Sequence, residues 1–236
     1  NYALLESNIS SNDFKTQFDN QTIRTVVLKN WPSEKFLYTV FLRLNTGSLK
    51  LSPQELRQAL HPGEFLKYVN NYTVESKVLQ KLLKLNKPDT RMRDVEIVIR
   101  YYAFKNYLND YKGNLKEFLD DACKNINAEW EINKECYIKQ LKEFELSIDF
   151  ATKVFGEKSR YSKYLNGNYT NIFNRVIFDV ITYYFSDPQI RSKLIGKELL
   201  IKESFEDIMT NDKEFIQATS ASTKDLDKTK LRYLKW

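Results

Sequence analysis

The sequence predicts a mainly α-helical, multi-helix protein with one N-terminal strand. Glycine and proline are rare, at six and five of 236 residues, which disfavours a protein built from hairpins. Apolar residues recur at helical spacing along most of the chain. Only Thr22–Leu28 (TIRTVVL) has the β-branched run of a strand. A single strand forms no sheet, so we expect its partners upstream of Asn1 or in another subunit.

Residues 36–60 predict two helices joined by a sharp polar turn. Ser33 is placed to cap an apolar helix that ends at Asn45-Thr46-Gly47, where Asn and Gly tolerate a positive φ. The next helix begins at Ser52-Pro53-Gln54-Glu55, in which Ser52 and Glu55 are spaced for a reciprocal capping box. Two interpretations of Asn45 stay open, a residue that ends a helix and an amide that binds a ligand.

The remaining helices follow from apolar spacing and from caps and breaks. We expect helices over residues 53–60, 65–69, 75–85, 91–107, 115–126, 133–154 and 171–185, and amphipathic segments near 199–209, 213–218 and 224–233. The helix over residues 91–107 is apolar nearly all round. Its charges Glu96 and Arg100 lie four residues apart, so we expect them to form a buried pair within the helix, in a structural or a catalytic role.

Charge and composition leave several function classes open and exclude others. The net charge of +6 is compatible with a polyanionic partner, but acids alternate with bases almost everywhere and favour nucleic acid only weakly. Cys123, Cys136 and His61 are too few for a four-ligand zinc site, and we expect two reduced thiols in a cytoplasmic protein. The sequence contains no run of eighteen apolar residues, so we expect no membrane partner. The start at Asn1 suggests a fragment.

Motifs of common catalytic sites do not occur in the sequence. GxxxxGK, GxGxxG, HExxH and GxSxG are all missing, and His61 is the sole imidazole, at a helix break with Pro62-Gly63. A carboxylate metal site is not marked by any DxD or ExK spacing in a strand. The stretch Lys158–Tyr169 interleaves basic and aromatic residues around an Asn166-Gly167 turn, as in a surface that binds a nucleic-acid strand or in a solvated loop.

The stretch of residues 41–65, which contains the turn at Asn45-Thr46-Gly47, resembles a segment of the GmrSD-type, ParB-like restriction endonuclease family. In that family a Phe-x-x-x-Asn motif precedes a Leu-Ser-x-x-Glu-Leu-Arg helix. The matching positions are Phe41, Arg43, Asn45, Gly47, Leu51, Glu55, Leu56 and Arg57. Further matches, in the same order along the chain, are Ile23-Arg24, Arg91-Met92, Asp94, Glu96, Arg100, Ala103, Phe104 and Thr219-Ser220.

The resemblance implies a division of the chain and of its chemistry. Residues 1–50 would be the remnant of a ParB-like α/β core, and residues 51–236 a C-terminal helical domain. Family members carry an upstream Asp-Gly-Gln-Gln-Arg motif for nucleotide hydrolysis or DNA cleavage, which this sequence lacks. The nucleoside triphosphate and divalent metal of a full-length protein would therefore act there, and we expect this chain alone to show no turnover and to bind no cofactor.

Two functional hypotheses follow from these expectations. In the first, the chain is the helical part of a DNA-restriction or phage-defence protein, a nuclease or NTPase. Arg43, Asn45 and Gly47 would then contact nucleotide or phosphate, with Phe41, Glu55 and Arg57 supporting their loop. In the second, the chain is a non-catalytic helical module that binds DNA or a protein partner. The partners expected are DNA, and the missing N-terminal core or another subunit.

Overall fold

The computed structural model describes residues 11–22, 25, 27–33, 36, 37, 39, 40, 43, 51–220 and 224–236. The described residues are mainly helical, as the sequence predicts. The chain separates into two units, residues 1–41 and 42–236, and each is described by itself. Among the described helices, none combines the length and hydrophobicity that a membrane span requires.

The first unit contains helix α2 (Ser11–Asp19). The expected cap at Ser33 is present, because its hydroxyl accepts a hydrogen bond from the Phe36 N–H at 3.2 Å. Within the predicted strand, the described residues Thr22, Thr25, Val27 and Leu28 belong to no helix or strand. Ile23, Arg24 and Val26 lie outside the described residues, and so do Phe41, Asn45 and Gly47 of the family motif.

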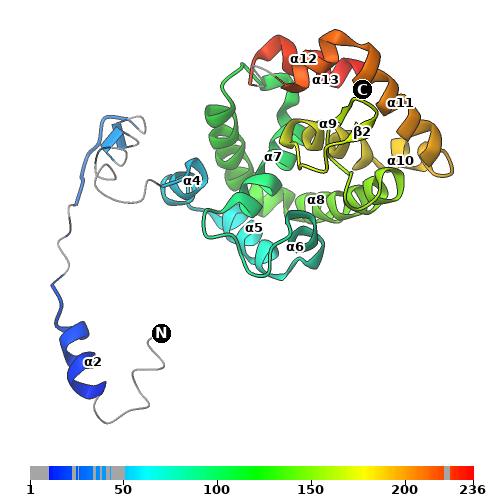
Figure 1. The fold of residues 1–236 in the computed structure, drawn as a ribbon. Helices are drawn as coiled ribbons and strands as arrows, with labels where there is room; N and C mark the ends of the chain where they lie inside the picture. Colours follow the sequence, from blue (N-terminus) through cyan, green and yellow to red (C-terminus); the bar gives the residue numbers. More distant parts are fainter. Residues whose placement is uncertain are drawn as a thin grey trace. The chain divides into compact units, whose positions relative to one another are not determined.

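The second unit is a multi-helix domain whose central helix is α7 (Arg93–Tyr107). Before α7 come α4 (Pro53–Leu60), α5 (Glu64–Glu75) and α6 (Lys77–Leu83). After it come the 3₁₀ turn η2 (Leu108–Asp110), α8 (Leu115–Phe155), the strands β1 (Tyr164–Leu165) and β2 (Asn168–Tyr169), α9 (Arg175–Phe185), α10 (Pro188–Leu194), α11 (Glu198–Asn211), α12 (Lys213–Ser220) and α13 (Leu226–Lys235). Helix α7 packs against α4, α5, α6, α8 and α9 (Figure 1).

The apolar sequence of α7 explains its central place, because almost every side chain from Asp94 to Phe104 is buried. The ring of Tyr102 is fully buried against Phe65 of α5, with ring centroids 5.1 Å apart in an edge-to-face arrangement. Its hydroxyl donates a 2.6 Å hydrogen bond to the carbonyl of Tyr137 on α8. Aromatic residues, which make up 14% of the sequence, thus form much of the core.

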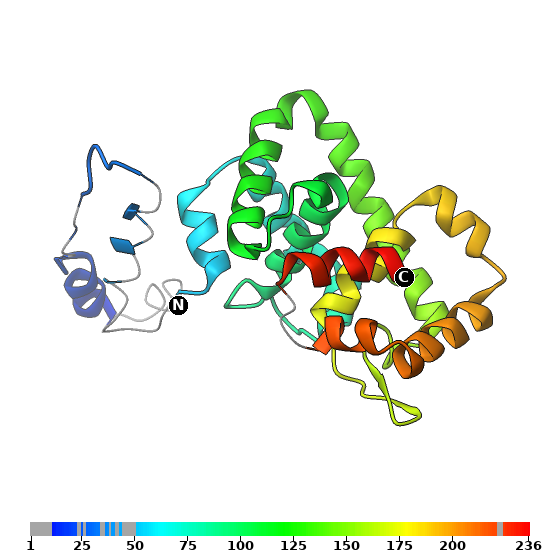
Figure 2. The same ribbon diagram turned by 90° about the horizontal axis from the view of Figure 1, so that it is seen from above.

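The two helices expected over residues 115–126 and 133–154 are one continuous helix, α8, of 41 residues. The expected break was wrong, because the residues between them include neither proline nor glycine. Trp130 in this interval is buried, and its ring stacks on that of Tyr137 with centroids 6.1 Å apart. Figure 2 shows α8 in green as the long helix that passes along the second unit.

The basic and aromatic stretch after α8 forms a short hairpin. Tyr164 pairs with Tyr169 and Leu165 with Asn168, and the turn residues Asn166 and Gly167 both have positive φ, at 51° and 77°. That geometry is the reason for the Asn-Gly sequence, since both residues tolerate the left-handed region. Tyr161 does not lie at the surface, because its side chain is fully buried.

Candidate anion-binding site

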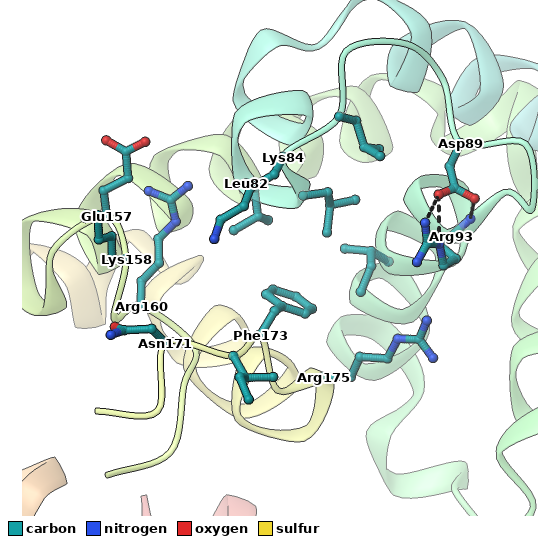
Figure 3. Close-up of a pocket in the computed structure, with 14 residues that line it drawn as sticks. Leu82, Lys84, Asp89, Arg93, Glu157, Lys158, Arg160, Asn171, Phe173 and Arg175 are labelled. Carbon is teal, nitrogen blue, oxygen red and sulfur yellow. Dashed lines mark hydrogen bonds and ion pairs between the residues drawn. The ribbon is translucent and has the colours of Figure 1, made fainter. Parts of the chain in front are cut away.

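A cavity of about 500 Å³ lies between the end of α6, the start of α7, the turn after α8 and the segment that leads into α9 (Figure 3). We call it the Phe173 cavity, since Figure 3 shows the Phe173 ring in its middle. Its apolar walls are Leu82, Leu83, Leu85, Ile97, Ile172 and Phe173. Its basic residues are Lys84, Arg93, Lys158, Arg160 and Arg175, against the two acids Asp89 and Glu157.

Arg160 is the buried cation of the Phe173 cavity, with 6% of its surface exposed. Its Nη1 donates a 2.9 Å hydrogen bond to Thr152 Oγ1, and the Thr152 hydroxyl in turn donates to the Ile148 carbonyl at 2.8 Å. The neutral hydroxyl therefore orients the guanidinium without neutralising it. Among the described carboxylates, none forms an ion pair with Arg160, Lys84 or Lys158.

Both acids of the Phe173 cavity already have basic partners. Glu157 pairs with Lys81 at 3.2 Å, and Asp89 accepts a 2.7 Å hydrogen bond from Arg93 Nε. Burial raises the pKa of the Asp89 carboxyl, but hydrogen bonds from the Arg93 side chain and from the backbone N–H groups of Arg91 and Arg93 outweigh it and leave the pKa lowered. The carboxylates thus leave the charge of Arg160 uncompensated.

A second cavity, of about 300 Å³, adjoins the first, because Arg175 lines both. We call it the Arg100 cavity; it lies among α4, α7, the start of α8, α9 and α13. Its basic residues are Arg57, Arg100, Lys116, Arg175, Lys224 and Arg232, and its acids are Glu96 and Asp179. Basic side chains thus outnumber acidic ones in both cavities.

The expected pair between Glu96 and Arg100 within α7 was wrong, because each residue binds α9 instead. Arg100 Nε donates to Asp179 Oδ1 at 3.0 Å, and Arg100 Nη2 also donates to Asp179 Oδ2. Glu96 lies 3.7 Å from Arg175 Nη1. The physical reason is that Arg175 and Asp179 are also one turn apart, so two facing helices exchange partners of opposite sign.

Arg100 nevertheless has the burial that the sequence predicts, with 5% of its surface exposed. Burial opposes its charge, but attraction to Asp179 and the hydrogen bonds that Arg100 donates to that carboxylate more than offset it and raise the pKa of the guanidinium. The Arg100–Asp179 pair is therefore a structural connection between α7 and α9. Its place in the wall of a basic cavity also exposes it to the field of any bound anion.

Glu55 and Arg57 have different roles on α4. Glu55 completes the predicted capping box, since Ser52 Oγ accepts from the Glu55 N–H at 3.1 Å and Glu55 Oε2 accepts from the Ser52 N–H at 2.5 Å. Arg57 is buried and donates from Nε to Asp120 Oδ1 on α8 at 2.7 Å. Arg57 thus fixes α4 to α8 and lines the Arg100 cavity.

The remaining predicted site residues are not brought together by described contacts. Arg43 is exposed and helical, while Phe41, Asn45 and Gly47 lie outside the described residues. His61 is buried at the end of α4, where its N–H donates to the Arg57 carbonyl at 2.9 Å. Over the described part of the chain, no three His, Cys, Asp or Glu side chains are grouped to hold a metal ion.

The residues that define the two cavities were mostly missed from sequence. Phe173, Arg175, Asp179 and Arg232 line the cavities without belonging to a local motif, and Asp120 binds Arg57 from 63 positions away in the sequence. A partial signal existed for Lys158 and Arg160, which belong to the basic and aromatic stretch 158–169.

Comparison with protein-family models, with curated proteins and with solved structures finds no match to this chain.

Proposed function

We propose that this chain is a nucleic-acid-binding helical module of a DNA-restriction or phage-defence protein. The observation that carries the proposal is the basic lining of the Phe173 and Arg100 cavities, which meet at Arg175. Phosphate groups of a nucleic acid bind Lys and Arg largely without regard to sequence, so a continuous basic surface is the electrostatic basis for such binding.

The surplus of positive charge around the Arg100 cavity supports the same proposal. Arg57 and Lys116 share one carboxylate, that of Asp120, at 2.7 Å and 3.0 Å. Arg232 also lines this cavity and acts electrostatically on Asp179, which accepts hydrogen bonds from Arg100. A phosphate bound in this cavity would lie among six basic side chains and only two acidic ones.

The test is a DNA-binding titration as a function of salt. Fluorescence anisotropy of a labelled duplex and of a labelled single strand would give Kd between low and moderate salt. Replacing Lys84 and Lys158 in the Phe173 cavity, or Lys116 and Lys224 in the Arg100 cavity, with Gln should weaken binding. If both positions in a pair contact duplex phosphates, each double variant should reduce the slope of log K against log salt by about 1.8.

A matched control comes from α8. Lys139 and Lys142 are exposed and line neither cavity. The double variant Lys139→Gln/Lys142→Gln removes the same net charge, so its binding should stay close to that of the wild type. An equal loss in this control would mean that only overall charge attracts DNA. No binding by the wild type at low salt would overturn the proposal.

Whether the full-length protein hydrolyses nucleotide or restricts phage through this chain depends on the Phe-x-x-x-Asn motif. If Asn45 binds nucleotide or phosphate in a full-length protein, Asn45→Gly should abolish hydrolysis or phage restriction while leaving the melting temperature near that of the wild type. Glycine adopts the left-handed helix-ending conformation but has no amide to offer. Full activity of this variant would reduce Asn45 to a turn residue.

A further inference from the structure

We propose that the Phe173 cavity binds one nucleoside phosphate, with the phosphate on Arg160 and the base against Phe173. This inference deepens the proposed function. It rests on that function where the nucleoside phosphate belongs to a bound nucleic-acid strand. The ligand comes either from a nucleic-acid strand or from a free nucleotide, and the two sources share the same chemistry. The cavity, at about 500 Å³, has the size of small-molecule sites in proteins.

The anionic half of the ligand is inferred from Arg160. Only 6% of the surface of Arg160 is exposed, and the side chain that it hydrogen-bonds is a neutral threonine. The charge of this buried guanidinium is therefore not neutralised by its surroundings. Lys84 stands on the same side of the cavity in Figure 3, and Lys158 also lines it. Three cations that the described acids leave unpaired point to an anion, and Arg160 offers it the planar donors that suit phosphate.

The planar, apolar half of the ligand is inferred from the apolar walls of the cavity. Phe173 packs edge-to-face on Tyr161 and tilted on Phe178, with ring centroids 6.0 Å and 5.4 Å apart, so the ring is held by the core. Figure 3 shows it pointing into the cavity. A fixed aromatic ring with aliphatic neighbours is a surface on which a base stacks. Inorganic phosphate would leave this half of the cavity unfilled.

The backbone next to Arg160 supports a functional position. Tyr161 adopts φ of 60°, a conformation that is costly for a bulky residue. Its buried ring and the 2.7 Å hydrogen bond from the Asn174 N–H to its carbonyl hold it there. The same bond connects the Arg160 turn to the segment that presents Phe173, so the two halves of the proposed site are fixed relative to each other.

The test uses the whole chain and isothermal titration with deoxyadenosine monophosphate, with deoxyadenosine and inorganic phosphate as partial ligands. We expect the monophosphate to bind one site per chain and both partial ligands to bind at least roughly tenfold more weakly. Phe173→Leu and the exposed double variant Lys84→Gln/Lys158→Gln should each weaken monophosphate binding. Arg160→Gln should abolish it, and Lys139→Gln/Lys142→Gln should leave it unchanged.

Melting temperatures identify a variant that fails to fold. If Arg160→Gln does so, Phe173→Leu and the exposed lysine pair carry the test. Equal affinity for inorganic phosphate and for the monophosphate would overturn the proposal, and so would monophosphate binding that no cavity variant changes.

A parallel titration with a single-stranded oligonucleotide separates the two sources. Oligonucleotide binding that Phe173→Leu weakens, with no binding of the free monophosphate, assigns the site to a nucleotide of a strand. Monophosphate binding with an oligonucleotide affinity unchanged by Phe173→Leu assigns it to a free nucleotide. DNA binding that persists while Phe173→Leu alters neither titration overturns this inference and leaves the proposed function standing.

Discussion

Arg100 on α7 and Asp179 on α9 form a buried ion pair across 79 positions of sequence. Next to them, Glu96 and Arg175 form a second, more exposed pair, so charges one turn apart on each helix meet charges of opposite sign on the other. From the pair Glu96–Arg175 to the pair Arg100–Asp179, the residue number increases by four on both helices. The two helices therefore run in the same direction through this contact. The four charges thus fix the register between α7 and α9.

Arg100→Ala should lower the free energy of unfolding by about 3–5 kcal/mol, because it leaves the buried Asp179 carboxylate uncompensated. Adding Asp179→Leu to an Arg100→Met background should recover much of this loss. The matched control is Glu96→Leu in the same background, which should recover little, since Glu96 pairs with Arg175. Chemical denaturation measures all of these values. Recovery of stability by Glu96→Leu rather than by Asp179→Leu would show that Arg100 pairs with Glu96 within α7 instead.

Arg57 and Lys116 provide a comparison around a shared carboxylate, Asp120. The Arg57 side chain is 1% exposed and that of Lys116 is 40% exposed. Arg57→Met should therefore destabilise the protein by about 3 kcal/mol, as expected for a broken buried pair. Lys116→Met should cost about 0–1 kcal/mol, as for an exposed pair. Equal effects in denaturant titrations would contradict the anchoring role of Arg57.

Asp89 should make stability depend on pH in the acid range. The pKa of its carboxyl is lowered from the ordinary value of 3.8 in the folded protein. The stabilisation is therefore complete above the unfolded pKa and is lost as the pH falls through the folded pKa. The stability difference between wild type and Asp89→Asn should shrink as the pH falls below 3.8. Glu131→Gln, at an exposed position of α8, is the control, and denaturation curves against pH measure the effect.

The two cysteines should differ sharply in reactivity. Cys123 is fully buried, and burial raises the pKa of its thiol to about 12, whereas Cys136 is exposed. A thiol reagent at pH 8 should label one cysteine quickly and the second only after denaturation. Cys136→Ser should make the native protein almost unreactive. Rapid labelling of two thiols in the wild type would show that the core around Cys123 opens readily.

Local features were the ones that the sequence by itself determined. The Ser52–Glu55 capping box, the Asn166-Gly167 turn and the burial of α7 all appear as predicted. Each depends on residues within one or two turns of each other, or on the apolar periodicity of a single helix, and both can be read without knowing the fold.

Only the tertiary structure decided which distant groups meet. Glu96 and Arg100 had the spacing of a pair within one helix, yet Arg100 hydrogen-bonds Asp179 and Glu96 forms an ion pair with Arg175, both on a neighbouring helix. The Phe173 cavity likewise combines the end of α6, the turn after α8 and the segment before α9. A local pattern specifies a helix and its buried face. The partner of a buried charge and the lining of a cavity depend on how several such faces pack together, which no single window of sequence contains.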